Sequence, residues 1–246
     1  MKAMVLAAGL GTRLRPLTDS RPKALVEING RTLLEITLTR LHEFGVTDVI
    51  VNVHHFADMV VEYLAAKQNF GMRIAISRED DLLLDTGGGL KKAAWFFLED
   101  GRDEPFLLHN VDVISDIDLR SMVEFHRAQR ALATLAVQQR PSSRQLLFDD
   151  SGLLCGRRFE KELCTELARH ADPLHPLAFC GIHVISPRML RTMTEDGVFS
   201  VIESYLRLAA EQERVMAFRA DGSYWRDLGT AESLEQAAND LQRGVG

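Results

Sequence analysis

The sequence predicts an α/β fold, in which a mixed, mostly parallel sheet forms the middle of three layers and carries helices on both faces. Two observations predict it. Short apolar runs alternate with helical patterns through the first half of the chain, and such repetition is typical of parallel sheets covered on both faces. The second half adds strand-like runs joined by a hairpin signal, which makes the sheet mixed. No linker-like segment divides the chain, so we expect a single domain over 1–246.

The first half, residues 1–130, contains four expected strands and three expected helices. The strands are apolar runs over 4–8, 48–53, 72–77 and 105–110. Helical spacing begins near Thr32, recurs over 57–70, and starts on glycines over 87–98. Glycines end the first two helices at Gly45 and Gly71, the usual C-cap choice. The carboxyl ends of these strands share one edge of the sheet, where ligands bind in such folds.

The second half, residues 131–246, mixes further strands with helices. We expect strands over 132–139, 176–186 and 215–220, and helices over 200–212 and 231–241. Two short strands should meet at Asp150-Ser-Gly152, which is a hairpin signal. Surface loops are expected over 139–144 and 169–176.

Composition narrows the classes of function. The 246 residues are 46% hydrophobic and 26% charged, with a formal net charge of −6. An acidic chain argues against a nucleic-acid partner, because phosphate backbones select proteins with a basic face. No apolar run approaches the ~20 residues of a membrane span. We therefore expect a cytoplasmic protein without nucleic-acid or membrane partners, acting as a monomer or a small homo-oligomer.

The opening stretch LAAGLGTRLRPLTDSRPKAL, from Leu6 to Leu25, gathers cations on a glycine loop directly after the first strand. Gly9 and Gly11 allow the backbone to approach a ligand closely, and successive N–H groups of such a turn form an anion-binding nest. Arg13 can bind phosphate oxygens in a forked geometry. Lys23 follows a proline, which stiffens the segment that carries it. We expect Lys23 to be exposed on this loop.

Three alternatives compete for this loop. A dinucleotide-binding G-x-G-x-x-G turn requires a third glycine where Leu14 stands, and a P-loop requires a G-K-[ST] that is absent here. A solvated surface turn also fits four cations among prolines and glycines. The loop alone does not distinguish between a phosphate-binding site and a surface turn.

Two aspartates follow candidate strands. Asp112 comes just after the run over 105–110, and Asp227 precedes Gly229-Thr230 and the last helix. Mg²⁺ usually takes one or two carboxylates plus phosphate and water, although aspartates at strand ends are also common turn residues. The glycines of LDTGGGL, over 84–90, can bring backbone groups to a base or a sugar, or they simply begin a helix with Thr86 as N-cap.

The combined pattern G-L-G-T-R-L-R-P-L-T…P-K-A-L, T-G-G-G and W-R-D-L-G-T resembles the sugar-1-phosphate nucleotidyltransferases, also called nucleotide-sugar pyrophosphorylases. The resemblance extends from Met1 to about Leu234. It is greatest to compact bacterial members similar to mannose-1-phosphate guanylyltransferases and N-acetylmuramate-1-phosphate uridylyltransferases. It implies a Rossmann-like fold of the nucleotide-diphospho-sugar transferase type, with a nucleotide-binding half over 1–130 and a sugar-binding half over 131–246.

The resemblance also implies roles for particular residues. Arg13 and Lys23 would be catalytic, with Arg13 on the leaving pyrophosphate and Lys23 on the transferred α-phosphate, and Asp112 and Asp227 would hold Mg²⁺. The implied nucleotide-binding residues are Leu6, Ala8, Gly9, Gly11, Thr12, Arg13, Gly87 and Gly88. The implied sugar-phosphate residues are Glu160, Lys161 and Gly181. Three positions depart from the family pattern: Ala24 and Glu162, where many members have proline, and Val111, where many have glycine.

The implied reaction joins an NTP and a sugar-1-phosphate to give an NDP-sugar and pyrophosphate, by in-line attack on the α-phosphate. Each pair of unit charges near 4 Å repels by about 1 kcal/mol in water and about 4 kcal/mol at an effective dielectric of 20, so two anionic substrates favour a divalent cation in addition to the lysine. A choline-phosphate cytidylyltransferase has a similar opening loop and is the alternative. The T-G-G-G element and the W-R-D-L-G-T ending favour a sugar substrate.

Overall fold

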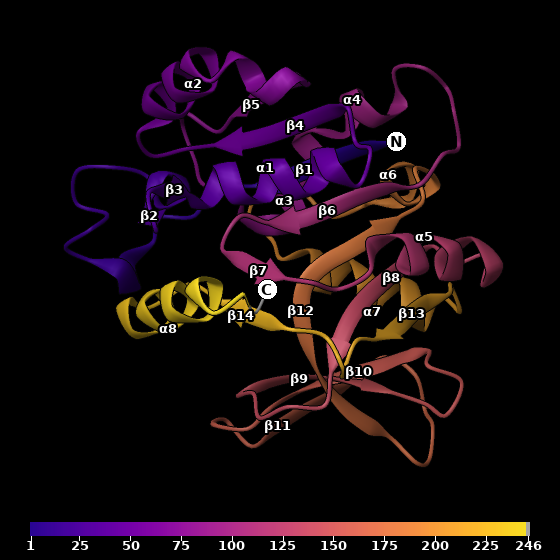
Figure 1. Ribbon diagram of the computed structural model, residues 1–246. Helices are drawn as coiled ribbons and strands as arrows, with labels where there is room; N and C mark the ends of the chain where they lie inside the picture. The colour runs from indigo at the N-terminus through magenta and orange to yellow at the C-terminus, as the bar shows by residue number, and fades with distance from the viewer. Residues whose placement is uncertain (245–246) are drawn as a thin grey trace.

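A sheet of ten strands runs through the computed structural model, which describes residues 1–244 (Figure 1). Its parallel part has the order β5 (Arg73–Arg78), β4 (Asp48–Val53), β1 (Lys2–Leu6) and β6 (Phe106–Asn110). The chain moves outward from β1 through β4 to β5 and then returns to the other side of β1. The predicted mixed, mostly parallel sheet is confirmed.

The long strand β12 (His175–Ile185) joins this parallel part to the rest of the sheet. Its second half is antiparallel to β6 and to β8 (Ala133–Gln138), which pairs in parallel with β13 (Val215–Arg219). Its first half pairs with β9 (Arg144–Phe148), followed by β10 (Leu154–Phe159) and β11 (Cys164–Leu167), all antiparallel. The register of β12 against β8 shifts between Phe179 and His183, around Gly181, whose φ is +73°.

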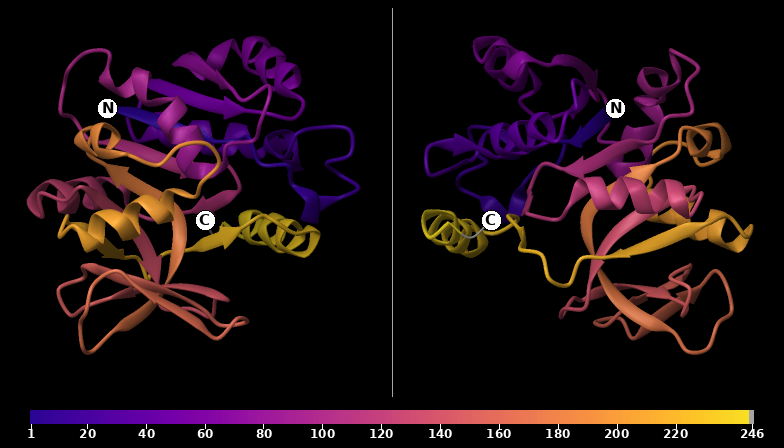
Figure 2. Two further views of the ribbon diagram at one scale, coloured as in Figure 1. Left: turned by 180° about the vertical axis from the view of Figure 1, so that it is seen from behind. Right: turned by 45° about the vertical axis from the view of Figure 1, so that its right-hand side comes forward.

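Helices cover both faces of the sheet, as predicted. One core contains side chains of α1 (Leu33–Glu43), α2 (Ala57–Ala66), α5 (Leu119–Ala128) and α8 (Ala231–Gln242). The other contains side chains of α3 (Asp85–Lys92), α4 (Ala94–Leu98), α6 (Arg188–Thr192) and α7 (Val201–Ala210). Along β1, Ala3 and Val5 belong to the first core and Met4 to the second, because successive strand residues point to opposite faces. Figure 2 shows α7 above the branch formed by β9, β10 and β11.

Several element boundaries differ from the predicted ones. The first strand ends at Leu6, so that Ala7 and Ala8 already belong to the loop. The predicted helix over 87–98 is two helices, α3 and α4, and the helix predicted over 57–70 ends at Ala66. The helix α5 and the strand β11 were not predicted. The sequence does contain a signal for α5, because aspartate is a favoured N-cap residue and Asp118 stands directly before this helix. In the structure its side chain accepts hydrogen bonds from the N–H groups of Arg120 and Ser121.

Two short ribbons lie outside the main sheet. The first pairs β2 (Glu27–Ile28) with β3 (Arg31–Thr32), beside α8, where the Asn29 side chain donates a hydrogen bond to the carbonyl of Ala238. The second pairs β7 (Val113–Ser115) with β14 (Trp225–Asp227), in antiparallel orientation. The second ribbon brings the two predicted metal aspartates into the same region.

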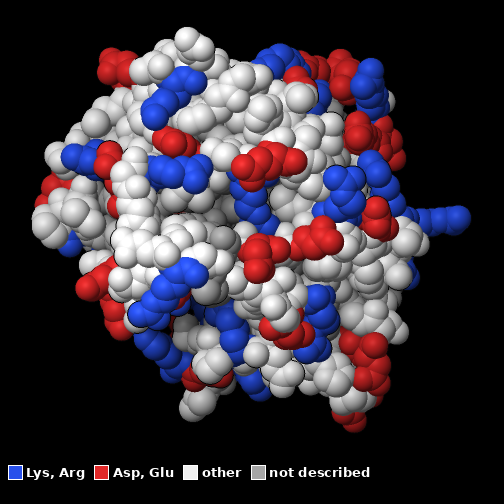
Figure 3. All heavy atoms as spheres, viewed as in Figure 1, with Lys and Arg blue, Asp and Glu red and all other residues white. Residues whose placement is uncertain are grey.

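The surface shows no single dominant charge on the face seen in Figure 3, where basic and acidic side chains are interspersed. Among residues 1–244, no helix is both long and apolar enough to cross a bilayer.

Replacing Gly87 with alanine should destabilise the fold, because the added Cβ would overlap the ring of Phe199. We expect a loss of about 1–3 kcal/mol in the free energy of unfolding, the range for overpacked sites. Urea denaturation of Gly87→Ala measures it. Gly222→Ala is the matched control, since an added Cβ there meets no atom within 4 Å. Equal stability of the two variants would contradict the packing described here.

Candidate active site

The candidate site lies at the carboxyl ends of β1 and β6, where the order of the parallel strands reverses. In sheets of this kind, ligands bind in the crevice at such a reversal. The loops after the two strands are tied together here, because the Val111 N–H donates a hydrogen bond of 3.1 Å to the carbonyl of Leu6. Asn52, on β4, accepts one of 2.8 Å from the N–H of Ala7. The loop that follows β1 is therefore held by both of its neighbouring strands.

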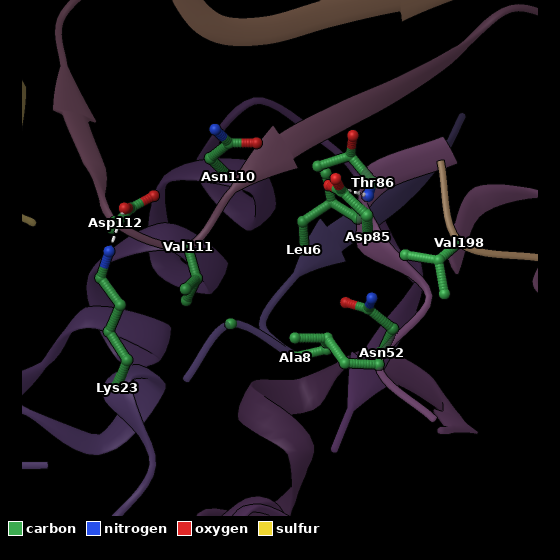
Figure 4. A pocket seen from close by; sticks show the side chains of 12 residues that line it. Leu6, Ala8, Lys23, Asn52, Asp85, Thr86, Asn110, Val111, Asp112 and Val198 are labelled. Carbon is green, nitrogen blue, oxygen red and sulfur yellow. Dashed lines mark hydrogen bonds and ion pairs between the residues drawn. The ribbon is translucent and has the colours of Figure 1, made fainter. Parts of the chain in front are cut away.

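A cavity of about 340 Å³ opens at this edge, and we call it the first cavity (Figure 4). Its lining comes from the loops after β1 and β6, from β4, and from the segments around α3 and Val198. The lining residues are Leu6, Ala8, Gly9, Lys23, Asn52, Leu83, Asp85, Thr86, Asn110, Val111, Asp112 and Val198. Five of the predicted site residues, Leu6, Ala8, Gly9, Lys23 and Asp112, thus line one cavity.

The glycine loop brings Lys23 close to the backbone after β1. Gly11 has a φ of +64°, and a Cβ added to it would lie 2.9 Å from Thr18 Cγ2 and 3.0 Å from Lys23 Cβ. Glycine is required at this position for both reasons. Gly9, in contrast, faces open space, because an added Cβ would meet nothing within 4 Å. Thr12 lies exposed on a short 3₁₀ helix, η1 (Thr12–Leu14), outside the lining of the cavity.

Lys23 forms an ion pair with Asp112, and Figure 4 shows the two side chains pointing toward one another. Lys23 begins η2 (Lys23–Leu25), and its side chain is only 10% exposed, against 17% for that of Asp112. The prediction that Lys23 is exposed was therefore wrong. The reason is tertiary: Asp112 follows β6, 89 residues from Lys23 in the sequence, and the pairing of β6 with β1 brings it to the lysine.

Asp227 reaches the same region through the ribbon of β7 and β14. In this ribbon Asp227 is paired with Val113, the neighbour of Asp112, and the Leu228 N–H donates to the carbonyl of Asp112. The Gly229 N–H donates a hydrogen bond of 2.8 Å to the Asp227 carboxylate. An Arg13 nitrogen lies 3.8 Å from the same carboxylate.

Gly229 makes the approach of Arg13 to Asp227 possible. A Cβ at this position would overlap the guanidinium of Arg13 and would lie 2.6 Å from an Asp227 oxygen. The Arg13 side chain remains 65% exposed, so its charge is available to a ligand.

Arg140 adds a third cation close to these groups, and it was not predicted. Its guanidinium lies 3.7 Å from the ring centre of Trp225 and donates to the carbonyl of Phe179. Burial lowers the pKa of Arg140, and its Nε is buried without a hydrogen-bond partner. The Trp225 ring is itself held by a hydrogen bond of 2.7 Å from Nε1 to the carbonyl of Cys180.

His109 supports the loop that carries Asp112. Burial lowers its pKa to about 4, with a smaller contribution from the charge of Arg40. The neutral ring has its Nδ1 at 2.8 Å from the carbonyl of Asn110, to which it donates. This hydrogen bond holds the backbone of Asn110, whose residue lines the cavity.

A second cavity, of about 480 Å³, shares Asp85, Thr86 and Asn110 with the first. It lies between the β9–β10 hairpin, β12 and the first turn of α7. Its other lining residues are Arg144, Gln145, Leu146, Arg157, Arg158, Phe159, Phe179, His183, Ser200, Val201, Ile202 and Glu203. The shared residues make the two cavities neighbours.

The predicted sugar-phosphate residues Glu160, Lys161 and Gly181 do not line either of the two cavities. Glu160 and Lys161 are exposed in the turn between β10 and β11, outside the lining of both cavities. The space left by Gly181 is occupied by Asn110 and Val113, since an added Cβ would lie 2.8 and 2.9 Å from their side chains. The cavity residues of this half come instead from β9, β10, β12 and the start of α7.

Gly87 and Gly88 are buried, and their N–H groups both donate to the carbonyl of Phe199, at 2.9 and 3.3 Å. An added Cβ at either position would overlap the segment that contains Gly197 and Phe199, so close packing explains why both residues are glycine. Their neighbours Asp85 and Thr86 line the first cavity. Thr86 is not the N-cap of α3, which begins one residue earlier, and its hydroxyl accepts a hydrogen bond from the N–H of Val201. The nucleotide-binding role of Gly87 and Gly88 stays a prediction.

Three of the residues that were not predicted had recognisable signals. Asn52 and Asn110 are polar residues near the carboxyl ends of apolar strands, which is the position that the strand-end rule singles out. Asp85 stands directly before the predicted glycine element. Arg140 and His183 gave no signal, because one lay in an expected loop and the other in an apolar strand.

The family model of the nucleotidyl transferases matches residues 2–146, more than half of the chain. The chain belongs to this family. Its similarity to the relatives described next identifies it as a sugar-1-phosphate nucleotidyltransferase. The N-acetylmuramate alpha-1-phosphate uridylyltransferase of Caulobacter vibrioides is 35% identical over 94% of this chain and 93% of its own length. The enzyme of the same name from Neisseria meningitidis is 30% identical, over 96% of each chain.

Other relatives carry different activities. A mannose-1-phosphate guanyltransferase of Candida albicans is 30% identical over 93% of this chain, which spans 61% of the relative's length. Among solved structures, a UDP-glucose pyrophosphorylase in complex with UDP-glucose superposes with a TM-score of 0.77 at 17% identity, covering 99% of this chain and 98% of its own. HddC from Yersinia pseudotuberculosis, in complex with GMP-PN, gives 0.74 at 20% identity, covering 98% and 99%. These structures share the fold.

Replacing Lys23 with alanine should destabilise the protein, because the mostly buried carboxylate of Asp112 would lose the ammonium group with which it pairs. We expect a loss of about 1–3 kcal/mol in the free energy of unfolding, measured by urea denaturation. In the double variant with Asp112→Asn, the loss caused by Lys23→Ala should shrink. Arg13→Ala is the control, since its side chain is mostly exposed and should change stability by less than about 0.5 kcal/mol. A Lys23→Ala variant as stable as the control would show that the pair contributes nothing.

Proposed function

We propose that this enzyme binds a nucleoside triphosphate in the first cavity and transfers its nucleotidyl group to a sugar-1-phosphate held in the second. The observation that carries the proposal is the group formed by Lys23, Asp112, Asp227 and Arg13 beside the glycine loop, at the strand reversal. Two cations and the open backbone of the glycine loop meet there with two aspartates from separate segments, the loop after β6 and the strand β14. A nucleotide triphosphate substrate also suits a cytoplasmic location.

The proposed reaction needs no protein nucleophile. A phosphate oxygen of the sugar-1-phosphate attacks the α-phosphorus, and the bond to the leaving pyrophosphate breaks as the new P–O–P linkage forms. Lys23 stabilises charge on the α-phosphate, and the exposed Arg13 binds the departing pyrophosphate. Binding of the triphosphate would draw the Lys23 ammonium away from Asp112. Catalysis then comes from positioning and electrostatic stabilisation.

Asp112 and Asp227 are the residues that would hold Mg²⁺ in this proposal. The donor set fits, because this cation takes one or two carboxylates and completes its shell with phosphate oxygens and water. The described residues contain no group of three or more His, Cys, Asp or Glu side chains that could hold an ion without a substrate. When bound, the cation would neutralise phosphate charge and help to align the two substrates.

We propose UTP and N-acetylmuramate α-1-phosphate as the first substrate pair to examine. The two relatives of this name match nearly their full length, whereas the guanyltransferase relative matches 61% of its own. GTP with mannose-1-phosphate is the second pair. The relatives reported above do not favour the choline-phosphate alternative, because they act on sugar phosphates.

Pyrophosphate release by the purified protein tests the proposal. The assay crosses UTP, GTP, dTTP, CTP and ATP with sugar-1-phosphates and with phosphocholine, in the presence of Mg²⁺. We expect release that requires both one NTP and one sugar phosphate, and its loss on addition of EDTA. Release only with CTP and phosphocholine would establish the alternative activity, and no release with any pair would contradict both.

Replacing Asp227 with asparagine should raise the Mg²⁺ concentration needed for half-maximal activity and lower the maximal rate at least tenfold. One carboxylate charge on the cation would be lost, while the hydrogen bond to Gly229 can be kept. A Mg²⁺ titration of the initial rate measures both effects. Asp150→Asn, in the exposed turn after β9, is the matched control and should titrate like the wild type. An unchanged titration of Asp227→Asn would place the cation elsewhere.

A further inference from the structure

His183 is a buried polar side chain that the proposed mechanism does not use. It lies on β12 directly after the register shift at Gly181, it is 1% exposed, and it lines the second cavity. Its ring packs edge-on against that of Phe179, with the ring centres 4.6 Å apart. Burial lowers its pKa to about 3, so the imidazole is neutral at physiological pH.

Tyr205 fixes which nitrogen of His183 carries the proton. The Tyr205 hydroxyl, on α7, is fully buried and lies 2.9 Å from Nδ1 of His183. A buried O–H group that donates to nothing is costly, so the hydroxyl donates and Nδ1 accepts. A neutral imidazole that accepts at Nδ1 carries its proton on Nε2. Tyr205 thus makes His183 Nε2 a hydrogen-bond donor.

Nε2 of His183 is the polar atom that this ring can offer to a ligand. It has no hydrogen-bond partner within residues 1–244, where the ring's hydrogen bond is the one made by Nδ1. The fully buried side-chain nitrogen and oxygen atoms without a partner belong to His109, Arg140, Arg158 and Ser204, and His183 is not among them. Since His183 lines the second cavity, Nε2 is the polar ring atom that remains for a ligand there.

The lining of the second cavity suits a sugar that carries a phosphate, since it contains the three cations Arg144, Arg157 and Arg158 beside aromatic and neutral polar groups. Phe159 and Phe179 are aromatic residues of this lining, and Thr86, Ser200 and Asn110 are neutral polar ones, of which Thr86 and Asn110 also line the first cavity. Carbohydrates bind to such combinations of aromatic surface and a few fixed polar groups. A neutral donor such as His183 Nε2 distinguishes sugars by where their oxygen atoms lie and not by their charge.

We propose that His183 is a specificity-determining residue of the sugar site, where it donates its Nε2 proton to a hydroxyl or acyl oxygen of the sugar ring, oriented for this by Tyr205. This inference rests on the proposed function, since it assumes that the second cavity holds the sugar. It assigns the discrimination between sugars to β12 and α7, away from the Glu160–Lys161 turn.

Two substitutions of His183 separate this role from a purely structural one. The amide nitrogen of glutamine in His183→Gln can occupy the place of Nε2 but leaves Tyr205 unpaired. Asparagine in His183→Asn can replace Nδ1 as the partner of Tyr205 but does not reach the cavity. We expect His183→Asn to raise KM for the sugar-1-phosphate about five- to tenfold, as for one lost hydrogen bond, with KM for the NTP unchanged. His183→Gln should stay within about threefold of the wild type.

A structural role predicts the opposite order, with His183→Gln the more damaging variant in both Tm and KM. That order, or an equal rise of KM for both substrates, would overturn the proposal while leaving the proposed function intact. A second measurement does not depend on turnover: ¹⁵N spectra of histidine-labelled wild-type protein. The His183 Nε2 resonance should show the Nε2–H form and shift on addition of at least one of N-acetylmuramate α-1-phosphate, mannose-1-phosphate and glucose-1-phosphate. No shift with any of the three would overturn the inference independently of the pyrophosphate assay.

Discussion

The ion pair between Lys23 and Asp112 is the interaction on which the rest of the site depends. Both side chains are mostly buried, and a buried charge is tolerated only with a partner. The pair ties the glycine loop after β1 to the loop after β6, across the point where the strand order reverses. Gly11 packs against Lys23 on one side, and the β7–β14 ribbon holds Asp112 and Asp227 on the other. The pair thereby holds together the two loops that carry the proposed phosphate-binding and metal-binding residues.

The same arrangement places two cavities side by side. Asn110, held by His109, lies on the boundary between them, together with Asp85 and Thr86 from the start of α3. In-line transfer requires the two substrates to meet end to end, and effective concentrations of correctly oriented groups supply a large part of such a rate acceleration. The first cavity is built by the parallel half of the sheet. The second is built by the antiparallel branch and α7, so the two proposed substrate sites follow the two parts of the fold.

Much of this could be predicted from the sequence, because apolar periodicity and the position of Asp112 after a strand are local properties. The motif that contains Asp227 could also be recognised from the sequence. The burial of Lys23 was not, since it depends on a partner 89 residues away. The three-residue strands β7 and β14 are too short to show a periodicity. In the sequence His183 is one more residue of an apolar strand, and its proposed role depends on Tyr205, which only the packing of α7 on β12 brings near. Glu160 and Lys161 matched a motif in letters but lie in an exposed turn.

The most direct test of the central claim is a crystal structure with Mg²⁺ and a non-hydrolysable analogue of the preferred NTP. The account predicts that the phosphates lie against Gly9 and Gly11 in the first cavity, with the Lys23 ammonium moved from Asp112 to a phosphate oxygen and the cation on Asp112 and Asp227. A nucleotide bound outside this cavity, with the pair of Lys23 and Asp112 intact, would contradict it.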